Sequence, residues 1–445
     1  MAGTLTRRNM LLAGAAGAGL VVLRSGIVTG ADAPSNKLNI AGIGVGGRGW
    51  ADLNACRSEN IVALCDVNAK NLAKAADKFP KARTYVDWRK CLEQKDIEAV
   101  VCGSTDHTHA FICTWAINRD LHVYCEKPLA ITVHEARTVR KKYLEKKDKL
   151  ATQMGTQIHA SDNYRRMVEM IRGGAIGTPQ EARVWCSRKP KGGSYLPAAG
   201  DPPDHLNWDL WIGPAPFHPY NSGYMGGCLA WNRFWDFGAG QIGDMGSHMM
   251  DMAYWGLGLS LPTTCKAEGS EPKSDATVPT WLTAEWDHPA NDWRPAVKVY
   301  WYDGGKKPGM PSKVFNRDDL FKGVIFKGDK GFLIADYGYR ILMPTGGDMT
   351  HYTAPKGKDD LIPPSPGHHN EWIIGAKTGK PTLCNFDYSG ALIENNMLAL
   401  AAYRAGNAPG NKPLQYDPAK GEVTNCPAVA KYLKKEYRDG WVLDG

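Results

Sequence analysis

The feature that most constrains this 445-residue chain is a short pattern close to its N-terminus. An apolar run, Lys37 to Ile43, ends in the glycine-rich segment Gly44-Val45-Gly46-Gly47-Arg48-Gly49. A helix-compatible stretch follows, and then a second apolar run, Ile61 to Cys65, which ends in Asp66. A strand, a glycine turn, a helix and a strand with an acid at its tip form the βαβ fingerprint of dinucleotide binding. The pattern predicts an α/β domain with a doubly wound parallel sheet.

Two registers of the glycine motif fit the sequence, Gly42/Gly44/Gly47 and Gly44/Gly46/Gly49. We prefer the second register because it leaves a full strand before the turn. In that register Asp66 follows Gly49 by 17 residues, close to the ~20 residues that the fingerprint expects. The glycines would let the backbone approach a pyrophosphate at the N-terminus of a helix. The alternative is a glycine turn without a ligand.

Asp66 bears on the choice of cofactor. A carboxylate at this position accepts hydrogen bonds from the adenosine ribose hydroxyls and repels a 2′-phosphate. NAD is therefore favoured. Lys70 is close enough in the sequence to reach a phosphate, so NADP stays open.

The alternation of strand and helix continues beyond Asp66. The strand expected at Ile97 to Gly103 precedes Ser104-Thr105-Asp106-His107-Thr108-His109, and the strand at Leu121 to Cys125 precedes Glu126-Lys127-Pro128. Ligands of such sheets bind beyond the carboxyl ends of the strands, so both polar clusters would face the nicotinamide. The alternatives are capping or packing for the two histidines and a surface position for Lys127. The residues expected to contact the cofactor are Gly44, Gly46, Gly47, Arg48, Gly49, Asp66, Thr105, His107, His109, Glu126 and Lys127.

The pattern changes after residue 156. A helix is expected at Asp162 to Gly173, and the strand-like runs are Gln180–Ser187, Trp281–Trp286, Ala296–Tyr302, Val324–Lys327 and Gly331–Ala335. Between them, residues 188–231 form a long loop, which in a compact domain is usually functional. Ten of the 15 tryptophans lie from Trp185 to Trp301. Their flat faces would suit a sugar, and the alternative is that they pack the sheet.

One later segment, Gly238 to Trp255, contains candidate catalytic residues. Asp244 and His248 are four residues apart, so on a helix they share one face. Histidine can take a proton from an alcohol, and Asp244 can orient it or hold a second hydroxyl. The alternatives are a helix cap with a packed histidine, or a metal site that adds Asp251. We prefer the catalytic interpretation and expect no metal.

The first 31 residues predict an export signal. Arg7 and Arg8 precede the uncharged stretch Met10 to Leu23, which is shorter than the ~20 apolar residues of a membrane span. A twin-arginine signal exports a folded protein, here to the periplasm or beyond. Cleavage could follow Thr29-Gly30-Ala31 or Ala31-Asp32-Ala33, and neither leaves an integral membrane segment. The alternative is an arginine pair before a buried helix.

Charge and cysteine content argue against a nucleic-acid partner and against two kinds of cysteine site. The net charge of +8 is scattered without an aromatic-interleaved basic face, so nucleic acid is not expected. The 11 cysteines include no CxxC pair, which argues against a zinc ribbon or a thioredoxin-like site. Export would permit disulfides. Nevertheless Cys65, Cys102 and Cys125 lie in apolar runs and are expected as buried free thiols.

Taken together, these features resemble the glucose–fructose oxidoreductase / inositol dehydrogenase / MocA family. The matching features are Gly44-x-Gly46-x-x-Gly49, Asp66, residues 105–109, Glu126-Lys127-Pro128 and Asp244-x-x-x-His248. The resemblance implies a Rossmann domain followed by an α+β domain with an open, mostly antiparallel sheet. It also implies hydride exchange between a sugar or polyol carbon and nicotinamide. Lys127 would then polarise the reacting hydroxyl, His248 would be the general base, and Asp244 would support it.

The expected organisation is a signal peptide at 1–31, an NAD(P)-binding domain at 36–156 and a substrate domain at 157–365. A helical segment at 366–405 would pack near the domain junction, and residues 406–445 would form a tail. We expect an exported carbohydrate dehydrogenase, a homo-oligomer that holds its cofactor tightly. The alternatives are redox-neutral glycoside cleavage with retained NAD, and an inert sugar- or nucleotide-binding protein.

Overall fold

The computed structural model describes residues 36–445 except 273, 312–319, 356 and 358–360. Of the preceding residues it describes only two short strands, β1 (Val21–Val22) and β2 (Val28–Thr29), which pair antiparallel. The rest of the expected signal peptide, including Arg7 and Arg8, lies outside the described residues.

The first half of the chain forms a six-stranded sheet in the order β5-β4-β3-β6-β7-β8, in which every pair is parallel. The strands are β3 (Asn39–Ile43), β4 (Asn60–Cys65), β5 (Arg83–Tyr85), β6 (Ala99–Cys102), β7 (His122–Cys125) and β8 (Thr152–Met154). The helices between them are α2 (Gly47–Ala55), α3 (Ala69–Lys78), α4 (Trp88–Cys91), α5 (Asp106–Asn118) and α6 (Val133–Lys146). The strand order reverses between β3 and β6, as in doubly wound nucleotide-binding sheets, and confirms the predicted Rossmann fold.

Both faces of this sheet are buried, which explains why its strands read as continuous apolar runs. Ile40 of β3 packs in the core that contains Leu53 of α2. The next residue, Ala41, points the other way and packs in the core that contains Phe111 of α5. Successive side chains of a strand alternate between faces, so one strand serves two cores.

The second half forms a nine-stranded sheet in the order β15-β14-β13-β9-β12-β11-β10-β16-β17. Only β9 and β12 pair in parallel among the neighbours, which confirms a mostly antiparallel sheet. The strands are β9 (Pro179–Cys186), β10 (Thr264–Gly269), β11 (Leu282–His288), β12 (Val297–Asp303), β13 (Lys322–Gly328), β14 (Gly331–Ala335), β15 (Arg340–Pro344), β16 (Leu414–Asp417) and β17 (Glu422–Val423). Strict alternation of buried and less buried residues in β11 shows that one face of this sheet meets the core.

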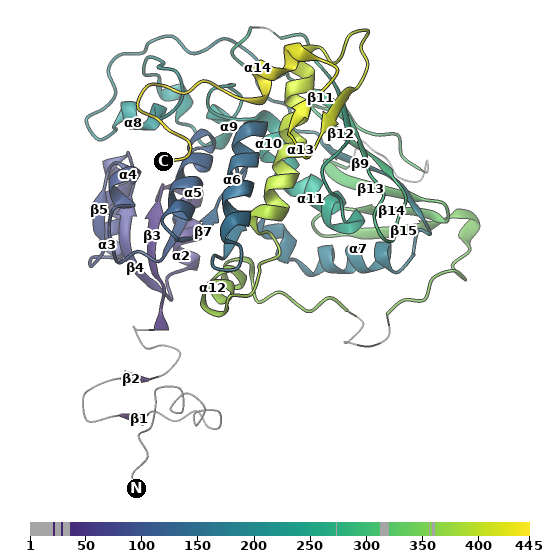
Figure 1. Ribbon diagram of the computed structural model, residues 1–445, viewed down its shortest axis with the longest axis horizontal. Helices are drawn as coiled ribbons and strands as arrows, with labels where there is room; N and C mark the ends of the chain where they lie inside the picture. Colours follow the sequence, from purple (N-terminus) through teal and green to yellow (C-terminus); the bar gives the residue numbers. More distant parts are fainter. Residues whose placement is uncertain are drawn as a thin grey trace.

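The segment expected as a C-terminal tail is part of this sheet. Strand β16 pairs antiparallel with β10, and β17 pairs with β16. The remaining chain then returns to the nucleotide-binding half and ends beside α5 (Figure 1). Residues 406–445 therefore join both halves of the molecule instead of projecting from it.

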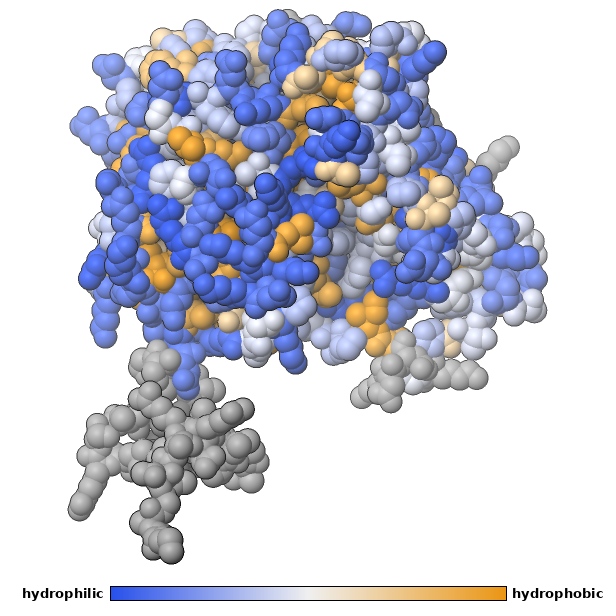
Figure 2. Space-filling view, in the orientation of Figure 1, coloured by the Kyte–Doolittle hydropathy of each residue, from blue (hydrophilic) through white to orange (hydrophobic). Residues whose placement is uncertain are grey.

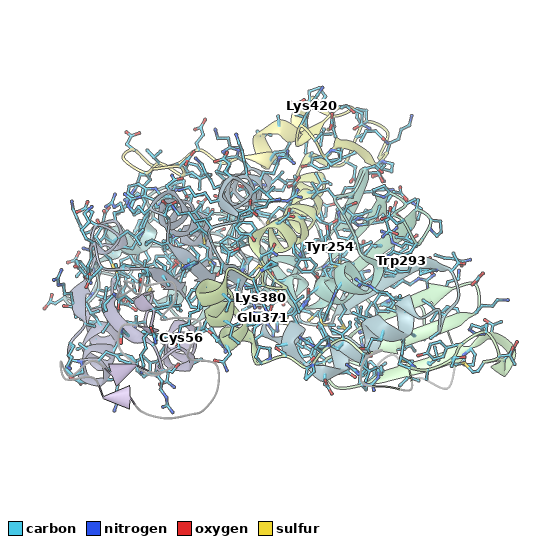
Figure 3. All side chains as sticks on the ribbon, turned by 60° about the horizontal axis from the view of Figure 1, so that its bottom comes forward. Cys56, Tyr254, Trp293, Glu371, Lys380 and Lys420 are labelled. Atoms are coloured by element: carbon cyan, nitrogen blue, oxygen red, sulfur yellow. The ribbon has the colours of Figure 1, made fainter. Side chains whose placement is uncertain are left out.

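The remaining helices lie around and between the two sheets. They are α7 (Asp162–Arg172), α8 (Trp208–Ile212), α9 (Cys228–Trp231), α10 (Gly240–Asp244), α11 (Gly246–Leu257), α12 (His368–Thr378), α13 (Phe386–Ala405) and α14 (Ala430–Leu433). Figure 3 shows α12, which carries Glu371, between Cys56 of the nucleotide-binding half and Trp293 of the second half. Helices α12 and α13 account for the helical segment expected at 366–405.

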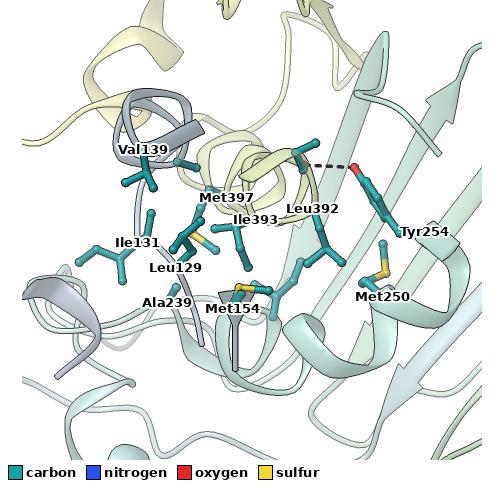
Figure 4. Close-up of a cluster of buried hydrophobic side chains, with 14 of the residues drawn as sticks. Leu129, Ile131, Val139, Met154, Ala239, Met250, Tyr254, Leu392, Ile393 and Met397 are labelled. Atoms are coloured by element: carbon teal, nitrogen blue, oxygen red, sulfur yellow. Dashed lines mark hydrogen bonds between the residues drawn. The ribbon is translucent and has the colours of Figure 1, made fainter. Parts of the chain in front are cut away.

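Helix α13 holds the two halves together. Asn385 caps its N-terminus by accepting hydrogen bonds from the N–H groups of Asp387 and Tyr388, and Gly406 ends it with φ 72°. Its buried side chains meet both halves: Ile393 and Met397 lie near Leu129 of the first half, and Leu392 lies near Met250 of α11 (Figure 4). Because this helix is buried almost all round, the two halves share one continuous core.

All eleven cysteines are free, and ten of them are buried, including Cys65, Cys102 and Cys125 as predicted. No helix among the described residues has the length and apolar character needed to cross a membrane. The face seen in Figure 2 is mostly hydrophilic, with hydrophobic residues in small separate groups.

Candidate active site

A cleft of about 1120 Å³ opens at the carboxyl ends of the parallel strands and extends to the second half of the chain. This volume exceeds the ~300–1,000 Å³ of a typical site for one small ligand, so a dinucleotide and a second molecule would fit together. The predicted residues that line it are Gly44, Gly46, Gly47, Arg48, Asp66, Thr105, His109, Glu126, Lys127, Asp244 and His248. Neither Gly49 nor His107 lines it.

The glycine turn has the geometry that the preferred register requires. Gly44 has φ 77°, and a Cβ there would lie 2.6 Å from the backbone nitrogen of Ser104. A Cβ on Gly49 would lie 1.9 Å from the carbonyl oxygen of Gly44. Gly49 therefore acts behind the cleft, where it lets α2 approach the turn. The N-terminus of α2, at Gly47, is left open to the cleft.

Asp66 closes the nucleotide end of the cleft. Its carboxylate accepts hydrogen bonds from the backbone N–H of Val45 (3.0 Å) and of Asn68 (2.8 Å). Burial raises the pKa of Asp66, and these hydrogen bonds oppose the rise. Lys70, which the sequence analysis considered as a possible contact for the 2′-phosphate of NADP, is exposed on α3 and does not line the cleft. The next residue, Asn71, does line it.

Arg48 and Glu126 bind each other across the cleft floor. The Nε of Arg48 lies 3.0 Å from Oε1 of Glu126, and its Nη2 lies 2.7 Å from Asp52. Burial, and then the nearby Asp52, raise the pKa of Glu126 to about 7. Glu126 also accepts a hydrogen bond from the backbone N–H of Lys127 at 3.2 Å. These two predicted cofactor contacts thus also hold the end of β7 against α2.

Lys127 and Asp244 meet although they are 117 residues apart. The Nζ of Lys127 contacts Oδ1 of Asp244, and Nη1 of Arg188 lies 2.9 Å from Oδ2. Burial alone would raise the pKa of Asp244, but Lys127 and then Arg188 outweigh it and lower the value. Burial opposes the charge on Lys127 as well, and Asp244 overcomes it and raises the pKa to about 12. The Asp244 carboxylate and the Lys127 ammonium are therefore charged near neutral pH.

His248 lies beside this ion cluster without joining it. Burial, and then the positive charge of Lys127, lower the pKa of His248 to about 3, so its ring is neutral near pH 7. Its Nδ1 is buried and has no hydrogen-bond partner. The ring stands edge-on to Tyr337, with centroids 6.2 Å apart. A neutral imidazole that no partner occupies can accept a proton.

Asp251, the third residue of the alternative metal site, points elsewhere. Its carboxylate lies 3.0 Å from Nδ1 of His159 and accepts a hydrogen bond from Tyr388 at 2.6 Å. Two buried groups of potential metal ligands exist among the described residues, Cys102/His109/Cys125 and His159/Asp251/Cys384. Neither group includes Asp244 or His248.

The histidines of α5 have different surroundings. His109 lines the cleft, and its ring nitrogens lie 2.8 Å from the carbonyl oxygen of Pro128 and 3.0 Å from that of Ser104. His107 is turned away, with Nε2 3.1 Å from the carbonyl oxygens of both Trp211 and Ile212. These carbonyls hold the ring of His107 outside the cleft, away from the place where the sequence predicted a cofactor contact.

Residues 203–231, here called the strap, cross from the second half onto the nucleotide-binding half. The backbone N–H of Asn207 donates to the carbonyl of Val67 (2.9 Å), and that of Ala69 donates to the carbonyl of His205 (2.7 Å). Near the other end of the strap, Nε1 of Trp231 donates to Asp106 at 2.9 Å. The strap thus lies within the long loop that was expected to be functional, and it covers the cleft next to Asp66.

Most tryptophans of the second half pack the structure. Trp185, Trp286 and Trp301 are fully buried in the sheet. Among the ten tryptophans from Trp185 to Trp301, only Trp211 and Trp231 line the cleft. Sequence reasoning also missed Arg188, Tyr337, Gln157 and Lys322, which line the cleft. Each lies near a strand end, and no local motif marks it.

Comparison with known proteins agrees with this geometry. Residues 37–155 match the model of an oxidoreductase family with an NAD-binding Rossmann fold, GFO_IDH_MocA, and residues 190–288 match the C-terminal alpha/beta domain of that family. These two segments match the models of the GFO/IDH/MocA oxidoreductase family. The match agrees with the resemblance predicted from the motifs.

Curated relatives match part of the chain. Inositol 2-dehydrogenase of Salmonella typhimurium is 31% identical over 146 residues, which cover 32% of this chain and 43% of that protein. Levoglucosan dehydrogenase of Pseudarthrobacter phenanthrenivorans is 29% identical over 202 residues, which cover 44% and 42%. The chain thus spans less than half the length of these relatives.

Solved structures share the fold over most of the chain. A levoglucosan dehydrogenase in complex with NADH and levoglucosan has a TM-score of 0.54 at 16% identity and covers 88% of this chain and 99% of its own. The WlbA dehydrogenase of Bordetella pertussis, in complex with NADH and UDP-GlcNAcA, has a TM-score of 0.57 at 15% identity and covers 83% and 96%. At these identities the likeness establishes the fold.

Proposed function

We propose that this chain is an NAD-dependent oxidoreductase that moves a hydride between a sugar or polyol carbon and nicotinamide. The observation that carries the proposal is a single cleft with two distinct ends. A glycine turn and Asp66 form one end, and the Lys127–Asp244–Arg188 cluster beside His248 forms the other. The relatives named inositol 2-dehydrogenase and levoglucosan dehydrogenase support a polyol or sugar as the substrate.

The nucleotide end fits NAD. A Cβ at Gly44 or Gly49 would collide with backbone, so the turn keeps the smooth surface that a pyrophosphate needs beside the N-terminus of α2. The Asp66 carboxylate would accept hydrogen bonds from the ribose and disfavour a 2′-phosphate. Bound NAD would accept the hydride. NADP is the second candidate, and the exposed position of Lys70 gives it little support.

Each residue of the substrate end would have its own role in the removal of the hydroxyl proton. The Lys127 ammonium would donate a hydrogen bond to the reacting hydroxyl and favour its ionised form. His248, neutral near pH 7, would take the hydroxyl proton as the hydride leaves the carbon. Asp244 would hold Lys127 in place and stabilise the imidazolium that forms. Arg188 would keep Asp244 ionised through its second oxygen.

Tight retention of the cofactor is part of this proposal. The C-terminal residues 434–445, here called the clasp, hold the strap from outside. Arg438 donates through its backbone N–H to Pro214 at 3.0 Å, and its guanidinium lies 2.6 Å from Asp209. The indole of Trp115 on α5 donates to the carbonyl of Val442 at 2.9 Å. These contacts would slow the release of a nucleotide bound under the strap.

Retention would favour chemistry that regenerates the cofactor in place. We propose export through the signal at 1–31, which would take a folded, NAD-loaded protein to a compartment with little free nicotinamide cofactor. Oxidation of a glycoside, elimination of its aglycone, addition of water to the resulting double bond and return of the hydride would then let one NAD serve many turnovers. This redox-neutral cycle is the second candidate function. An inert binding protein is the third candidate, and the presence of Lys127, Asp244 and His248 together counts against it.

The test is to purify the protein without added nucleotide and identify the small molecules that denaturation releases by mass spectrometry. We expect about one NAD per chain. Addition of sugars and polyols should then produce the absorbance of reduced nicotinamide, and appearance of a free aglycone without that absorbance would identify the redox-neutral cycle. A protein that binds NAD but changes no substrate would support the inert alternative. Cell fractionation would test the export signal, and the mass in solution would test the expected homo-oligomer.

A further inference from the structure

Three large apolar side chains are exposed inside the cleft, and two of them, Leu229 and Phe321, are more than half exposed. Leu229 on α9 and Phe321, directly before β13, are each 51% exposed, and both line the cleft. Single exposed apolar residues are common on soluble proteins, but apolar groups that share one hollow mark a binding surface. Ile158 and Met225, both half-buried, line the same cleft.

These residues belong to the substrate end. Cys228, the neighbour of Leu229, has its pKa raised to about 11, first by burial and then by Asp244. The carbonyl of Phe321 accepts a hydrogen bond from the N–H of Ser187 at 2.8 Å, and Arg188 is the next residue. The chain neighbours of Leu229 and Phe321 therefore lie near the ion cluster, and both side chains line the same cleft. A third exposed apolar residue of the cleft, Val86, lies at the nucleotide end and is 43% exposed. It directly follows Tyr85, whose carbonyl accepts a hydrogen bond from the N–H of Asp66.

We infer that the cleft beside the ion cluster is a subsite for the apolar aglycone of a glycoside, formed by Leu229 and Phe321. The inference rests on the proposed function and narrows its substrate class. The charged groups at Lys127, Asp244 and Arg188 suit sugar hydroxyls. A free sugar held by those groups would leave much of the apolar surface of Leu229 and Phe321 in water, and a hydroxyl placed against Leu229 would lose its hydrogen bonds. An aryl or alkyl group joined to the sugar meets the apolar wall without that loss.

The experiment uses the NAD-loaded protein and matched pairs of methyl and 4-nitrophenyl glycosides of glucose, galactose, mannose and N-acetylglucosamine. Calorimetry measures the dissociation constant of each. We expect at least one sugar for which the aryl glycoside binds about tenfold tighter than the methyl glycoside, because the ring removes apolar surface from water. Leu229→Ser and Phe321→Ser should each remove most of that preference and leave methyl glycoside binding unchanged.

Phe217→Ser is the matched control, because Phe217 lies on the strap and is 61% exposed but does not line the cleft. It should keep the aryl preference. Retained NAD and an unchanged unfolding temperature show that each variant is folded. Absence of an aryl preference across the panel, or its persistence in both cleft variants, overturns the inference. A change of oligomeric mass in those variants also overturns it, since the apolar wall would then be a subunit contact.

The proposed function has a separate readout in the same samples. Production of reduced nicotinamide from free sugars or methyl glycosides, with no aryl preference, would leave the function standing and refute the aglycone subsite. An aryl preference without any redox or cleavage product would refute the function and leave the subsite.

Discussion

The two ends of the cleft are built in different ways. The nucleotide end consists of backbone and strand tips that lie within one local unit, from Gly44 to Asp66. The substrate end consists of long side chains from separate elements, with Lys127 after β7, Arg188 after β9 and Asp244 on α10. A local unit can be recognised from spacing alone, whereas the second end exists only after the two halves have packed together. The comparison makes distinct predictions for each end.

Lys127→Met should cause the largest loss of activity, and the loss should arise at the substrate end without a change in NAD binding. The variant loses the charge that holds Asp244 and polarises the hydroxyl, and such groups contribute roughly 10²–10⁴-fold to rate. Turnover with sugars should therefore fall by about that factor, while the NAD content after purification stays the same. Lys127→Arg, which keeps a charge near Asp244, should recover part of the rate. Full activity in Lys127→Met would remove Lys127 from the mechanism.

Asp66→Ala should alter the binding of the nucleotide and leave the rate of the reaction nearly unchanged. Hydrogen bonds to a charged group are worth ~1.5–3 kcal/mol, so the preference for NAD over NADP should fall by about tenfold or more. The rate at saturating NAD should change little. Asp77→Ala, an exposed acid on α3, is the control. An unchanged preference in Asp66→Ala would mean that Asp66 does not face the ribose.

Acid should destabilise the fold through buried neutral histidines in both halves. Burial, as the main cause, lowers the pKa of His107 and His288 to about 4 and that of His248 and His368 to about 3. In the unfolded chain these histidine rings take up protons near pH 6.5. The free energy of unfolding therefore has its full value above that pH and decreases as the pH falls toward 4 and 3. Each histidine could cost up to ~2 kcal/mol between pH 7 and pH 5.

Urea unfolding at both pH values measures this loss. His288→Asn, outside the cleft, should remove the contribution of one histidine to the pH dependence without changing NAD retention. A free energy of unfolding that is equal at pH 7 and pH 5 would contradict the assignment of neutral buried rings.

Weakening the clasp should give the smallest effect, at the nucleotide end. Trp441→Ala removes the ring that lies 4.3 Å from the Arg89 guanidinium and 6.1 Å from the ring of Trp88, a cleft residue. NAD should then dissociate several-fold faster in a competition experiment followed by fluorescence. Lys420→Ala, on the exposed turn between β16 and β17, should leave the rate unchanged. Equal rates in the wild type and in Trp441→Ala would mean that the clasp does not retain the cofactor.

The sequence predicted the nucleotide half well because its signals are local. Gly44, Gly49 and Asp66 have the spacing of the dinucleotide fingerprint. The alternation of strands and helices also shows which polar residues directly follow a strand. The family resemblance placed Lys127 and Asp244 in one site, with Asp244 supporting His248, but it did not predict that the two side chains pair. Nothing within residues 120–130 indicates a partner 117 residues away.

The misses have a common physical cause, which is distance along the chain. The ring of His107 is set by carbonyls 104 and 105 residues later, in the strap. Arg188 reaches Asp244 because β9 ends beside the start of β13, a register that no local pattern encodes. Strand β16 is four residues long and forms against β10, so the C-terminal region looked like a tail.

The central claim is that both ends of the cleft serve one bound cofactor. A crystal structure of the NAD-loaded protein tests it most directly. The account predicts a pyrophosphate on the Gly44–Gly49 turn, a ribose at Asp66, and both Lys127 Nζ and His248 within ~8 Å of the nicotinamide C4, close enough for a hydrogen bond to the substrate or one bridging water. A nicotinamide that points away from the Lys127–Asp244–Arg188 cluster would contradict it.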